Sequence, residues 1–378
     1  MIARIDARSR SSRRKVRYAV VGLGHIAQVA VLPAFAHASE NSELVALVSD
    51  HPGKLRALGR RYDVQGTYSY DEYEVCLASG KIDAVYIALP NDLHRDYAER
   101  AAQAGVHVLC EKPMALTENE CDSMIRIAEA NRVKLMIAYR LHFEKANLAA
   151  IEIARSGRIG EPRYFSSDFS MQVRERNIRV KRERGGGPLY DIGIYCINAA
   201  RYLFRDEPTE VLATAIRSGQ KRFQEVEESV AAILRFPGER VASFVCSFGA
   251  ADVAEYRIVG TEGNLRVEPA YEYAFGLKHH LTVGDKTRTT AFPKRDQFAP
   301  ELIHFSKCVL EDREPEPSGT EGLADVRIID AIHRSIDRGA SVELEPWKLS
   351  RRPSKGQEIS RPPVRKPRLV GVRSGHRE

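Results

Sequence analysis

Residues 16–27 read VRYAVVGLGHIA, an apolar run that ends in two closely spaced glycines and leads into a helix-forming stretch. A Gly-x-Gly-x-x-Ala pattern between a strand and a helix is typical of the first unit of a dinucleotide-binding Rossmann domain. Gly22 and Gly24 permit a tight turn and let backbone N–H groups approach a pyrophosphate, and Ala27 keeps the helix near the strand. The alternative is a coincidental glycine turn in another α/β protein. The strand-loop-helix setting favours nucleotide binding.

Residues 16–140 alternate short apolar runs with helical patterns, as a parallel sheet with crossover helices requires. The predicted strands there are 18–21, 44–48, 84–88, 107–110 and 134–138, and the predicted helices are 25–38, 52–62, 92–104 and 118–131. Further along, β-branched and aromatic runs follow one another directly, which predicts antiparallel strands. They are 164–173, 211–217, 229–236, 242–248, 255–259 and 264–268, with helices near 188–204, 298–312 and 321–338.

We therefore predict an α/β protein with two domains. An N-terminal doubly wound Rossmann domain covers residues 16–140, and a C-terminal α+β domain with a large, mostly antiparallel open sheet covers 141–346. Pro, Arg, Ser and Gly dominate from residue 349 on, and a basic arm precedes the first strand. Because such segments cannot build a core, we expect disorder in residues 1–15 and 347–378.

The net charge of +7 belongs to the chain ends, since residues 1–17 carry +6, residues 348–378 carry +8, and the body carries −7. Terminal charge runs are usually solvated, so we expect no nucleic-acid partner. No run of about 18 apolar residues exists, which argues against a membrane partner. The six cysteines stand singly without metal-ligand spacing, so we expect no metal and a cytoplasmic location.

The end of the second predicted strand is where a Rossmann domain distinguishes NAD from NADP. Asp50 could hold a ribose diol, as in NAD enzymes, or could equally cap the helix that begins near Pro52. Ser49 and Lys54 could instead bind a 2′-phosphate through a hydroxyl and a charge. These signals conflict, and the residues alone leave both cofactors open.

Glu111-Lys112-Pro113 lies just past the strand predicted at 107–110, at the carboxyl edge where doubly wound sheets bind ligands. Hydride transfer to or from an alcohol carbon requires a group that takes or returns the hydroxyl proton. Lys112 suits this role, because burial beside a cationic nicotinamide would lower its pKa toward working pH. A surface lysine in a turn is the alternative.

Asp191 and Tyr195 are four residues apart on the helix predicted at 188–204, which places them on one face. A carboxylate and a phenol there could bind polyol hydroxyls and steady a lysine. The alternative is an Asp favoured by the helix dipole beside a Tyr that only packs.

Three more polar residues follow predicted strands on the same ligand edge. Asn91 and His94 come after the strand at 84–88 and could contact nicotinamide or substrate, although Asn91 could equally cap a helix. Arg140 ends the strand at 134–138, where it could meet a hydroxyl or a phosphate, or form an ion pair between domains.

In their order along the chain these motifs resemble the Gfo/Idh/MocA family, and within it the glucose-fructose oxidoreductase branch. The resemblance spans residues 16 to 345 and rests on Gly22-Leu23-Gly24, Leu89-Pro90-Asn91 to His94, Glu111-Lys112-Pro113, Tyr139-Arg140 and Asp191-Ile192-Gly193-Ile194-Tyr195. It implies an α/β second domain whose open sheet makes a homodimer or homotetramer. It also implies a cis bond between Lys112 and Pro113.

The resemblance implies roles as well, with Lys112 as catalytic acid/base assisted by Asp191 and by Tyr195, where many members carry His. Ser49, Lys54 and Tyr70 match residues around a 2′-phosphate, so NADP is preferred and NAD stays possible. Asp50 departs from the Gly of that branch, and Ile178 stands where relatives often place Trp before Arg. The expected cofactor site comprises Gly22, Leu23, Gly24, His25, Ile26, Ser49, Asp50, Lys54, Tyr70, Leu89, Pro90, Asn91, His94, Glu111, Lys112 and Arg140. The expected substrate site comprises Lys112, Arg140, Arg179, Asp191 and Tyr195.

The leading hypothesis is an oxidoreductase that moves hydride between NADP and a sugar or polyol, an aldose such as glucose, with Lys112 as acid/base. A tightly held cofactor recycled between two sugars is a secondary hypothesis. One alternative is a cyclitol (inositol) dehydrogenase. Another is a non-catalytic NAD(P)-binding sensor or scaffold, which needs the glycine loop but not Lys112.

Overall fold

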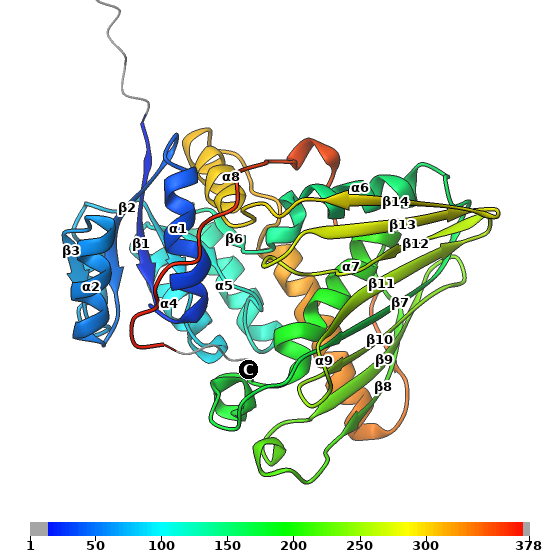
Figure 1. The fold of residues 1–378 in the computed structure, drawn as a ribbon. Helices are drawn as coiled ribbons and strands as arrows, with labels where there is room; N and C mark the ends of the chain where they lie inside the picture. The colour runs from blue at the N-terminus through cyan, green and yellow to red at the C-terminus, as the bar shows by residue number, and fades with distance from the viewer. Residues whose placement is uncertain (1–13, 373–378) are drawn as a thin grey trace, which may run out of the picture.

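Residues 14–372 are described by a computed structural model, in which two sheets lie side by side with helices around and between them (Figure 1). None of the helices in this range combines the length and the apolar character that crossing a bilayer requires. The basic arm predicted at 1–15 falls outside the described residues except for its last two.

The N-terminal sheet has six parallel strands in the order β3-β2-β1-β4-β5-β6, the doubly wound arrangement predicted from the sequence. The strand order reverses between β1 and β4, and ligands bind such sheets at the carboxyl ends of the strands beside this reversal. The strands are β1 (Val16–Val21), β2 (Ser42–Val48), β3 (Gly66–Tyr68), β4 (Ala84–Ile87), β5 (His107–Cys110) and β6 (Leu135–Ile137).

The helix that follows the glycine loop begins at His25 and winds as a π-helical turn, η1 (Ala27–Val31), before α1 (Leu32–Ala34) and the 3₁₀ turn η2 (Phe35–His37). Thr117 caps α5 by accepting the Glu120 N–H at 3.3 Å. The remaining helical elements of this region are α2 (Pro52–Tyr62), α3 (Tyr73–Leu77), η3 (Asn91–Leu93), α4 (His94–Gln103) and α5 (Glu118–Ala130).

One helix from the range predicted for the second domain packs on the N-terminal sheet instead. α8 (Ala299–Leu310) places Leu302 and Phe305 in one apolar core with the first strand, and its Ser306 hydroxyl lies 2.7 Å from the Tyr18 hydroxyl. A doubly wound sheet needs apolar helices on both faces, and α8, from far along the chain, covers part of one face of the N-terminal sheet. The predicted boundary at residue 141 does not anticipate this return.

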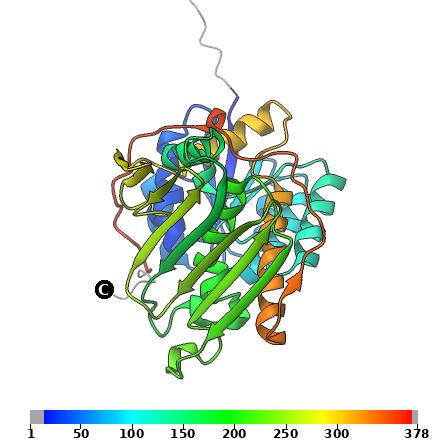
Figure 2. The ribbon, with the colours of Figure 1, turned by 90° about the vertical axis from the view of Figure 1, so that its right-hand side faces the viewer.

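The second sheet has nine strands in the order β14-β13-β12-β11-β7-β10-β9-β8-β15, and only the β7–β10 pair is parallel. Figure 2 shows this sheet in front of the helices, so within residues 14–372 its outer face carries no helix layer. The polar hairpin β13–β14 was not predicted. The strands are β7 (Pro162–Ser170), β8 (Glu210–Ile216), β9 (Ser229–Phe236), β10 (Arg240–Ser247), β11 (Val253–Gly260), β12 (Gly263–Val267), β13 (Leu277–Val283), β14 (Lys286–Phe292) and β15 (Val342–Glu343).

The helix predicted at 188–204 begins with a second π-helical turn, η7 (Leu189–Gly193), and continues as α7 (Ile194–Phe204). Near its end the fully buried guanidinium of Arg201 meets Glu207 at 2.7 Å and Glu321 at 2.8 Å, and it also pairs with Asp325. Glu321 and Asp325 belong to α9 (Gly319–Arg338), so this buried network joins α7 to α9. α6 (Lys145–Arg155) lies on the same inner side.

The disorder predicted for residues 347–378 is wrong for residues 349–372, which we call the C-terminal strap. The strap runs from the second domain across the front of α1, as the red segment of Figure 1 shows. Its Arg352 pairs with Glu207 at 2.7 Å and its Arg361 with Glu40 at 2.8 Å. Composition correctly excluded a core of its own, but single polar contacts to a folded body are enough to order it.

Candidate active site

A cavity of about 580 Å³ opens between the two domains at the carboxyl edge of the Rossmann sheet. Residues from both domains line it, which is where doubly wound folds bind cofactor and substrate. Seventeen of the predicted site residues line this cavity: Gly22, Leu23, Gly24, His25, Ile26, Ser49, Lys54, Tyr70, Leu89, Pro90, Asn91, Glu111, Lys112, Arg140, Arg179, Asp191 and Tyr195.

The glycine loop has the geometry that a dinucleotide needs. Gly22 adopts a positive φ of 94°, and a Cβ there would lie 2.5 Å from the Ala88 carbonyl oxygen, so only glycine fits. A Cβ on Gly24 would meet no protein atom within 4 Å, which leaves its backbone open to a ligand on the cavity side. The loop therefore fits the close approach of a pyrophosphate.

The far end of the cavity carries the residues expected around an adenosine ribose. Ser49, Lys54 and Tyr70 line it, and burial raises the pKa of the Tyr70 hydroxyl to about 12. Asp50 is not among the residues that line the cavity, and its Oδ1 accepts the Tyr70 N–H at 2.8 Å. This hydrogen bond occupies one carboxylate oxygen, so the expected contact of Asp50 with a ribose diol stays a prediction.

His94 was predicted to touch nicotinamide or substrate, and its position contradicts this. The ring is fully buried, with Nδ1 2.7 Å from the Pro113 carbonyl and Nε2 3.0 Å from the Leu89 carbonyl. Burial lowers the pKa of this histidine. His94 therefore links two segments that line the cavity. Asn91 lies in the cavity wall, where its side-chain amide donates a hydrogen bond of 2.8 Å to the Gly185 carbonyl.

Lys112 lies between the domains and contacts both Asp191 and Tyr195, the residues predicted to assist it. Its Nζ donates to the main-chain oxygen of Asp191 at 2.6 Å and lies 3.3 Å from Asp191 Oδ1. The same nitrogen is 4.7 Å from the centre of the Tyr195 ring, and Arg179 Nε binds Asp191 Oδ2 at 2.5 Å. The Lys112–Pro113 bond is cis, as the resemblance implied. The structure thus brings the three predicted catalytic residues together.

The protein surroundings of Lys112 act on its pKa in opposite directions. Burial lowers its pKa, but Tyr195, Asp191 and Glu111 outweigh burial, so the pKa of Lys112 is raised above its ordinary value. Burial likewise acts to raise the pKa of Asp191, but Arg179 and Lys112 hold that pKa well below its usual range. Lys112 and Asp191 therefore form an ion pair, and the lowering that the sequence predicts for Lys112 beside a cationic nicotinamide stays a prediction.

The opposite wall contains residues that the sequence did not single out. Arg140 donates to the Tyr271 carbonyl and lies 3.3 Å from the Tyr195 hydroxyl, and its guanidinium stacks 5.2 Å from the Tyr273 ring. Phe298, at the start of α8, completes this aromatic surround. The one sequence signal was the aromatic-rich stretch AYEYAF at 270–275.

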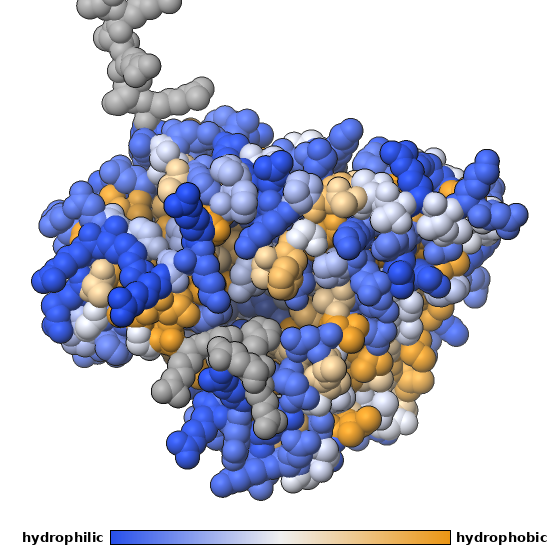
Figure 3. Space-filling model, viewed as in Figure 1, coloured by the Kyte–Doolittle hydropathy of each residue, from blue (hydrophilic) through white to orange (hydrophobic). Residues whose placement is uncertain are grey.

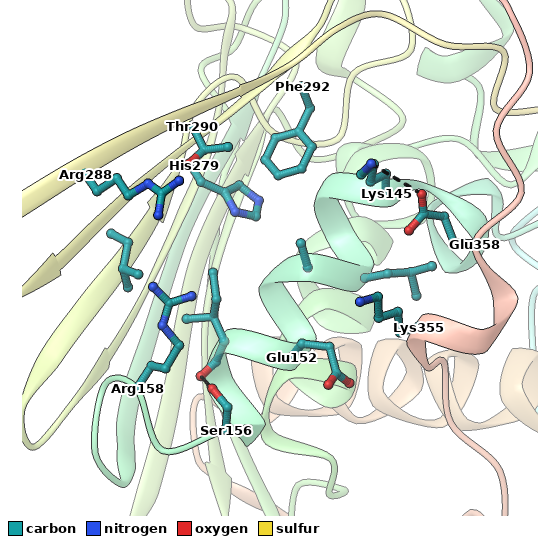
Figure 4. A pocket seen from close by; sticks show the side chains of 14 residues that line it. Lys145, Glu152, Ser156, Arg158, His279, Arg288, Thr290, Phe292, Lys355 and Glu358 are labelled. Atoms are coloured by element: carbon teal, nitrogen blue, oxygen red, sulfur yellow. Dashed lines mark hydrogen bonds and ion pairs between the residues drawn. The ribbon is translucent and has the colours of Figure 1, made fainter.

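A second cavity of about 460 Å³ lies between α6, the β13–β14 hairpin and the strap (Figure 4). Figure 4 shows Arg158 and Arg288 on one side and Lys145, paired with Glu358, on the other. None of the predicted site residues lines it. Among the described residues, no group of His, Cys, Asp and Glu is arranged to hold a metal ion.

Comparison with known proteins bears on both domains. A family model described as an oxidoreductase family with an NAD-binding Rossmann fold, GFO/IDH/MocA, matches residues 16–139. The model of the GFO/IDH/MocA C-terminal domain matches residues 147–266. The two models follow one another along the chain in the order of the observed domains.

Individual relatives cover most of the chain. The D-xylose 1-dehydrogenase [NADP(+)] of Haloarcula marismortui is 33% identical over 87% of this chain and 93% of its own. The crystal structure of aldose-aldose oxidoreductase from Caulobacter crescentus, complexed with glycerol, is 38% identical, covers 88% of this chain and 100% of its own, and has a TM-score of 0.84. KijD10, a 3-ketoreductase from Actinomadura kijaniata in complex with NADP and TDP-benzene, is 25% identical, covers 85% of this chain and 98% of its own, and has a TM-score of 0.79.

Proposed function

The chain belongs to the GFO/IDH/MocA oxidoreductase family, and from that premise we propose that it transfers hydride between NADP and an aldose sugar. The observation that carries the proposal is one cavity that holds the glycine loop together with Lys112, Asp191 and Tyr195. Relatives named as xylose dehydrogenase and aldose-aldose oxidoreductase support the substrate class.

NADP is the proposed cofactor. Gly22 and Gly24 would hold its pyrophosphate, and Ser49, Lys54 and Tyr70 would surround its 2′-phosphate. Asp50 is not among the residues that line the cavity, and its Oδ1 accepts the Tyr70 N–H, which supports a phosphate at this end. When bound, the cofactor supplies or accepts the hydride.

Proton transfer falls to Lys112 in this proposal. Its ammonium group, held charged by Asp191 and Tyr195, would hydrogen-bond the reacting oxygen of the sugar and donate a proton during carbonyl reduction. Asp191, fixed by Arg179, would orient Lys112, and the Tyr195 hydroxyl beside Arg140 would bind a neighbouring sugar hydroxyl. Sugar oxidation needs the neutral amine, so its rate should rise with pH while reduction slows.

The direct test is reduction of NADP, followed at 340 nm, with D-xylose, D-glucose, other aldoses and myo-inositol. We expect turnover with at least one aldose and little with inositol. A preference for inositol would favour a cyclitol dehydrogenase. NADP binding without turnover on any of these substrates or on their oxidised products would favour a sensor or scaffold and contradict the proposal.

A cofactor that stays bound and passes hydride between two sugars is a specific form of this proposal. The aldose-aldose oxidoreductase relative motivates it, because that name describes two sugar partners. Protein purified through extensive dialysis should then retain about one NADP(H) per chain. Cofactor-free protein after such treatment would argue for ordinary release after each turnover.

We also propose that the chain forms a homodimer or homotetramer through the outer face of its large sheet. Leu212, Ile233, Val241 and Val245 expose more than two fifths of their surface there, and Leu212 and Ile233 face each other across β8 and β9. Figure 3 shows orange apolar side chains along the side of the molecule where β8 to β10 lie. Light scattering of wild type and Ile233→Lys would test this.

The free cysteines fit the cytoplasm, where thiols stay reduced.

A further inference from the structure

The tip of the C-terminal strap lies beside the glycine loop, and one buried side chain joins the two. Gln28, on the helix that follows the loop, donates from Nε2 to the Leu23 carbonyl at 3.0 Å and to the Val370 carbonyl at 3.0 Å. Its Oε1 accepts the Val370 N–H at 2.8 Å. The Gln28 side-chain amide thus makes two hydrogen bonds with the main chain of Val370. It also binds the carbonyl of Leu23, the residue between the two glycines.

The same tip reaches the residues expected around the 2′-phosphate. Gly371 has a positive φ of 60°, and a Cβ there would lie 3.3 Å from Lys54 Cε and 3.4 Å from His51 Nε2. Arg61, at the end of α2, donates to the Arg368 carbonyl at 2.7 Å. The strap therefore bridges the two elements that form the adenosine end of the cavity, the glycine-loop helix and α2.

The rest of the strap is built to keep its tip in place. Arg361 binds Glu40 at 2.8 Å and the His37 carbonyl at 3.1 Å, which anchors the strap before it crosses to the loop. Three prolines between residues 361 and 368 restrict the backbone of the crossing, so little entropy is left to lose when the tip binds.

The strap also has the charge that an anionic cofactor attracts. Arg361, Arg365, Lys366 and Arg368 stand within eight residues, with no acidic residue between Arg361 and Val372. Arg365, Lys366 and Arg368 are exposed, and none of the three forms an ion pair with another residue in the range 14–372. A dinucleotide phosphate carries several negative charges, which a basic segment near the site would stabilise.

We propose that the strap is a third component of the NADP site, with residues 368–371 closing its adenosine end. Bound NADP would then leave only after Val370 detaches from Gln28 and the tip moves away from Lys54. This inference rests on the proposed function, because it requires NADP in this cavity. It gives the basic C-terminus of the sequence a role in cofactor retention.

The test is the rate at which NADPH dissociates, measured by stopped-flow fluorescence with excess NADP as competitor, and it requires no sugar. Deletion of residues 367–378 should speed dissociation at least about tenfold, the change expected from losing one or two hydrogen bonds. The matched control is deletion of residues 373–378, which leaves the tip and should keep the wild-type rate. Val370→Pro, which removes the N–H that Gln28 accepts and also replaces the Val370 side chain, should speed dissociation by a smaller factor.

The outcomes separate the two proposals. If both deletions and Val370→Pro all release NADPH at the wild-type rate, the role of the strap is overturned while NADP binding stays intact. Full-length protein that binds no NADPH would overturn the proposed function itself. If deletion of 367–378 prevents folding, Val370→Pro decides the question, and an unchanged rate in that variant contradicts the proposal.

Discussion

Two clusters of basic and acidic side chains occupy the two ends of one helical segment, and they differ mainly in access. At the start, Lys112 and Arg179 meet Asp191 on η7, with side chains 12%, 34% and 20% exposed. At the end, Arg201 of α7 meets Glu321 and Asp325 with at most 6% exposed. The first cluster borders the cavity and the second has no opening to it.

The difference shows that ion pairing alone does not mark a functional site. Charges beside the cavity can exchange a protein partner for a ligand, whereas sealed charges can only hold elements together. Removing a member of the first cluster should therefore lower the turnover rate, and removing a member of the second should lower the free energy of unfolding.

The sharpest test of this contrast is Lys112→Met. Loss of the proton-transferring group should reduce kcat by a factor between about 10³ and 10⁴, or about 4–5.5 kcal/mol of barrier. NADP affinity and the unfolding midpoint should change little. Lys145→Met on α6 removes an equal charge outside the cavity and should keep full turnover. Comparable turnover in both variants would remove Lys112 from the mechanism.

Arg201→Met should show the opposite pattern. It leaves Glu321 and Asp325 buried without their cation, which costs about 3–5 kcal/mol of unfolding free energy. Urea denaturation measures this cost, and turnover per folded molecule should stay near wild type. Arg163→Met breaks the exposed pair with Glu161 and should cost at most about 1 kcal/mol. A similarly small cost for Arg201→Met would show that burial does not separate the two clusters.

His142 adds a pH-dependent contact next to the sealed cluster. It is buried between Glu316 and Asn198, each at 2.9 Å, and although burial lowers its pKa, Glu316 raises the pKa to about 9. Because the folded pKa lies above the unfolded value of about 6.5, the stabilisation is complete below pH 6.5 and is lost as pH rises through 9.

The measurement is the unfolding free energy of wild type and His142→Gln at pH 6 and pH 10. The difference between the proteins should shrink by up to about 3 kcal/mol at the higher pH. His280→Gln, on the exposed side of β13, should show no such change. A pH-independent difference would mean that His142 acts without its charge.

The smallest expected effect concerns the far end of the cavity. Lys54→Ala should weaken NADP binding about tenfold, or about 1.4 kcal/mol, and change NAD binding little, because only NADP carries the 2′-phosphate. Arg56→Ala, an exposed position on the same helix, is the control. Calorimetric titration of both cofactors gives the result, and equal losses for NAD and NADP would speak against a phosphate at Lys54.

Sequence reasoning succeeded where a local pattern determines position. The Rossmann strands, the glycine loop and the family resemblance are confirmed by the sheet order and by the family models. Lys112 could be located because it follows a strand on the ligand edge. Asp191 and Tyr195 could be paired because helical spacing puts them on one side.

Sequence reasoning failed where distant contacts decide. Tyr271 and Phe298 reach the cavity only because the second sheet and α8 fold back on the first domain. The role of Asp50 depends on a main-chain N–H twenty residues away. The strap was misjudged because composition reports whether a segment can build a core, not whether a folded surface will bind it.

The π-helical turn at Leu189–Gly193 ties the two clusters together through the phase of the helix that follows it. Each residue rotates an α-helix by about 100°, so deleting Ile192 or Gly193 would turn Asp191 relative to Tyr195 and Arg201, which follow on α7. Asp191 could then not meet Lys112 while Arg201 kept its partners on α9. An insertion or deletion here would therefore disturb either the cavity cluster or the sealed cluster, even where it removes neither Asp191 nor Arg201.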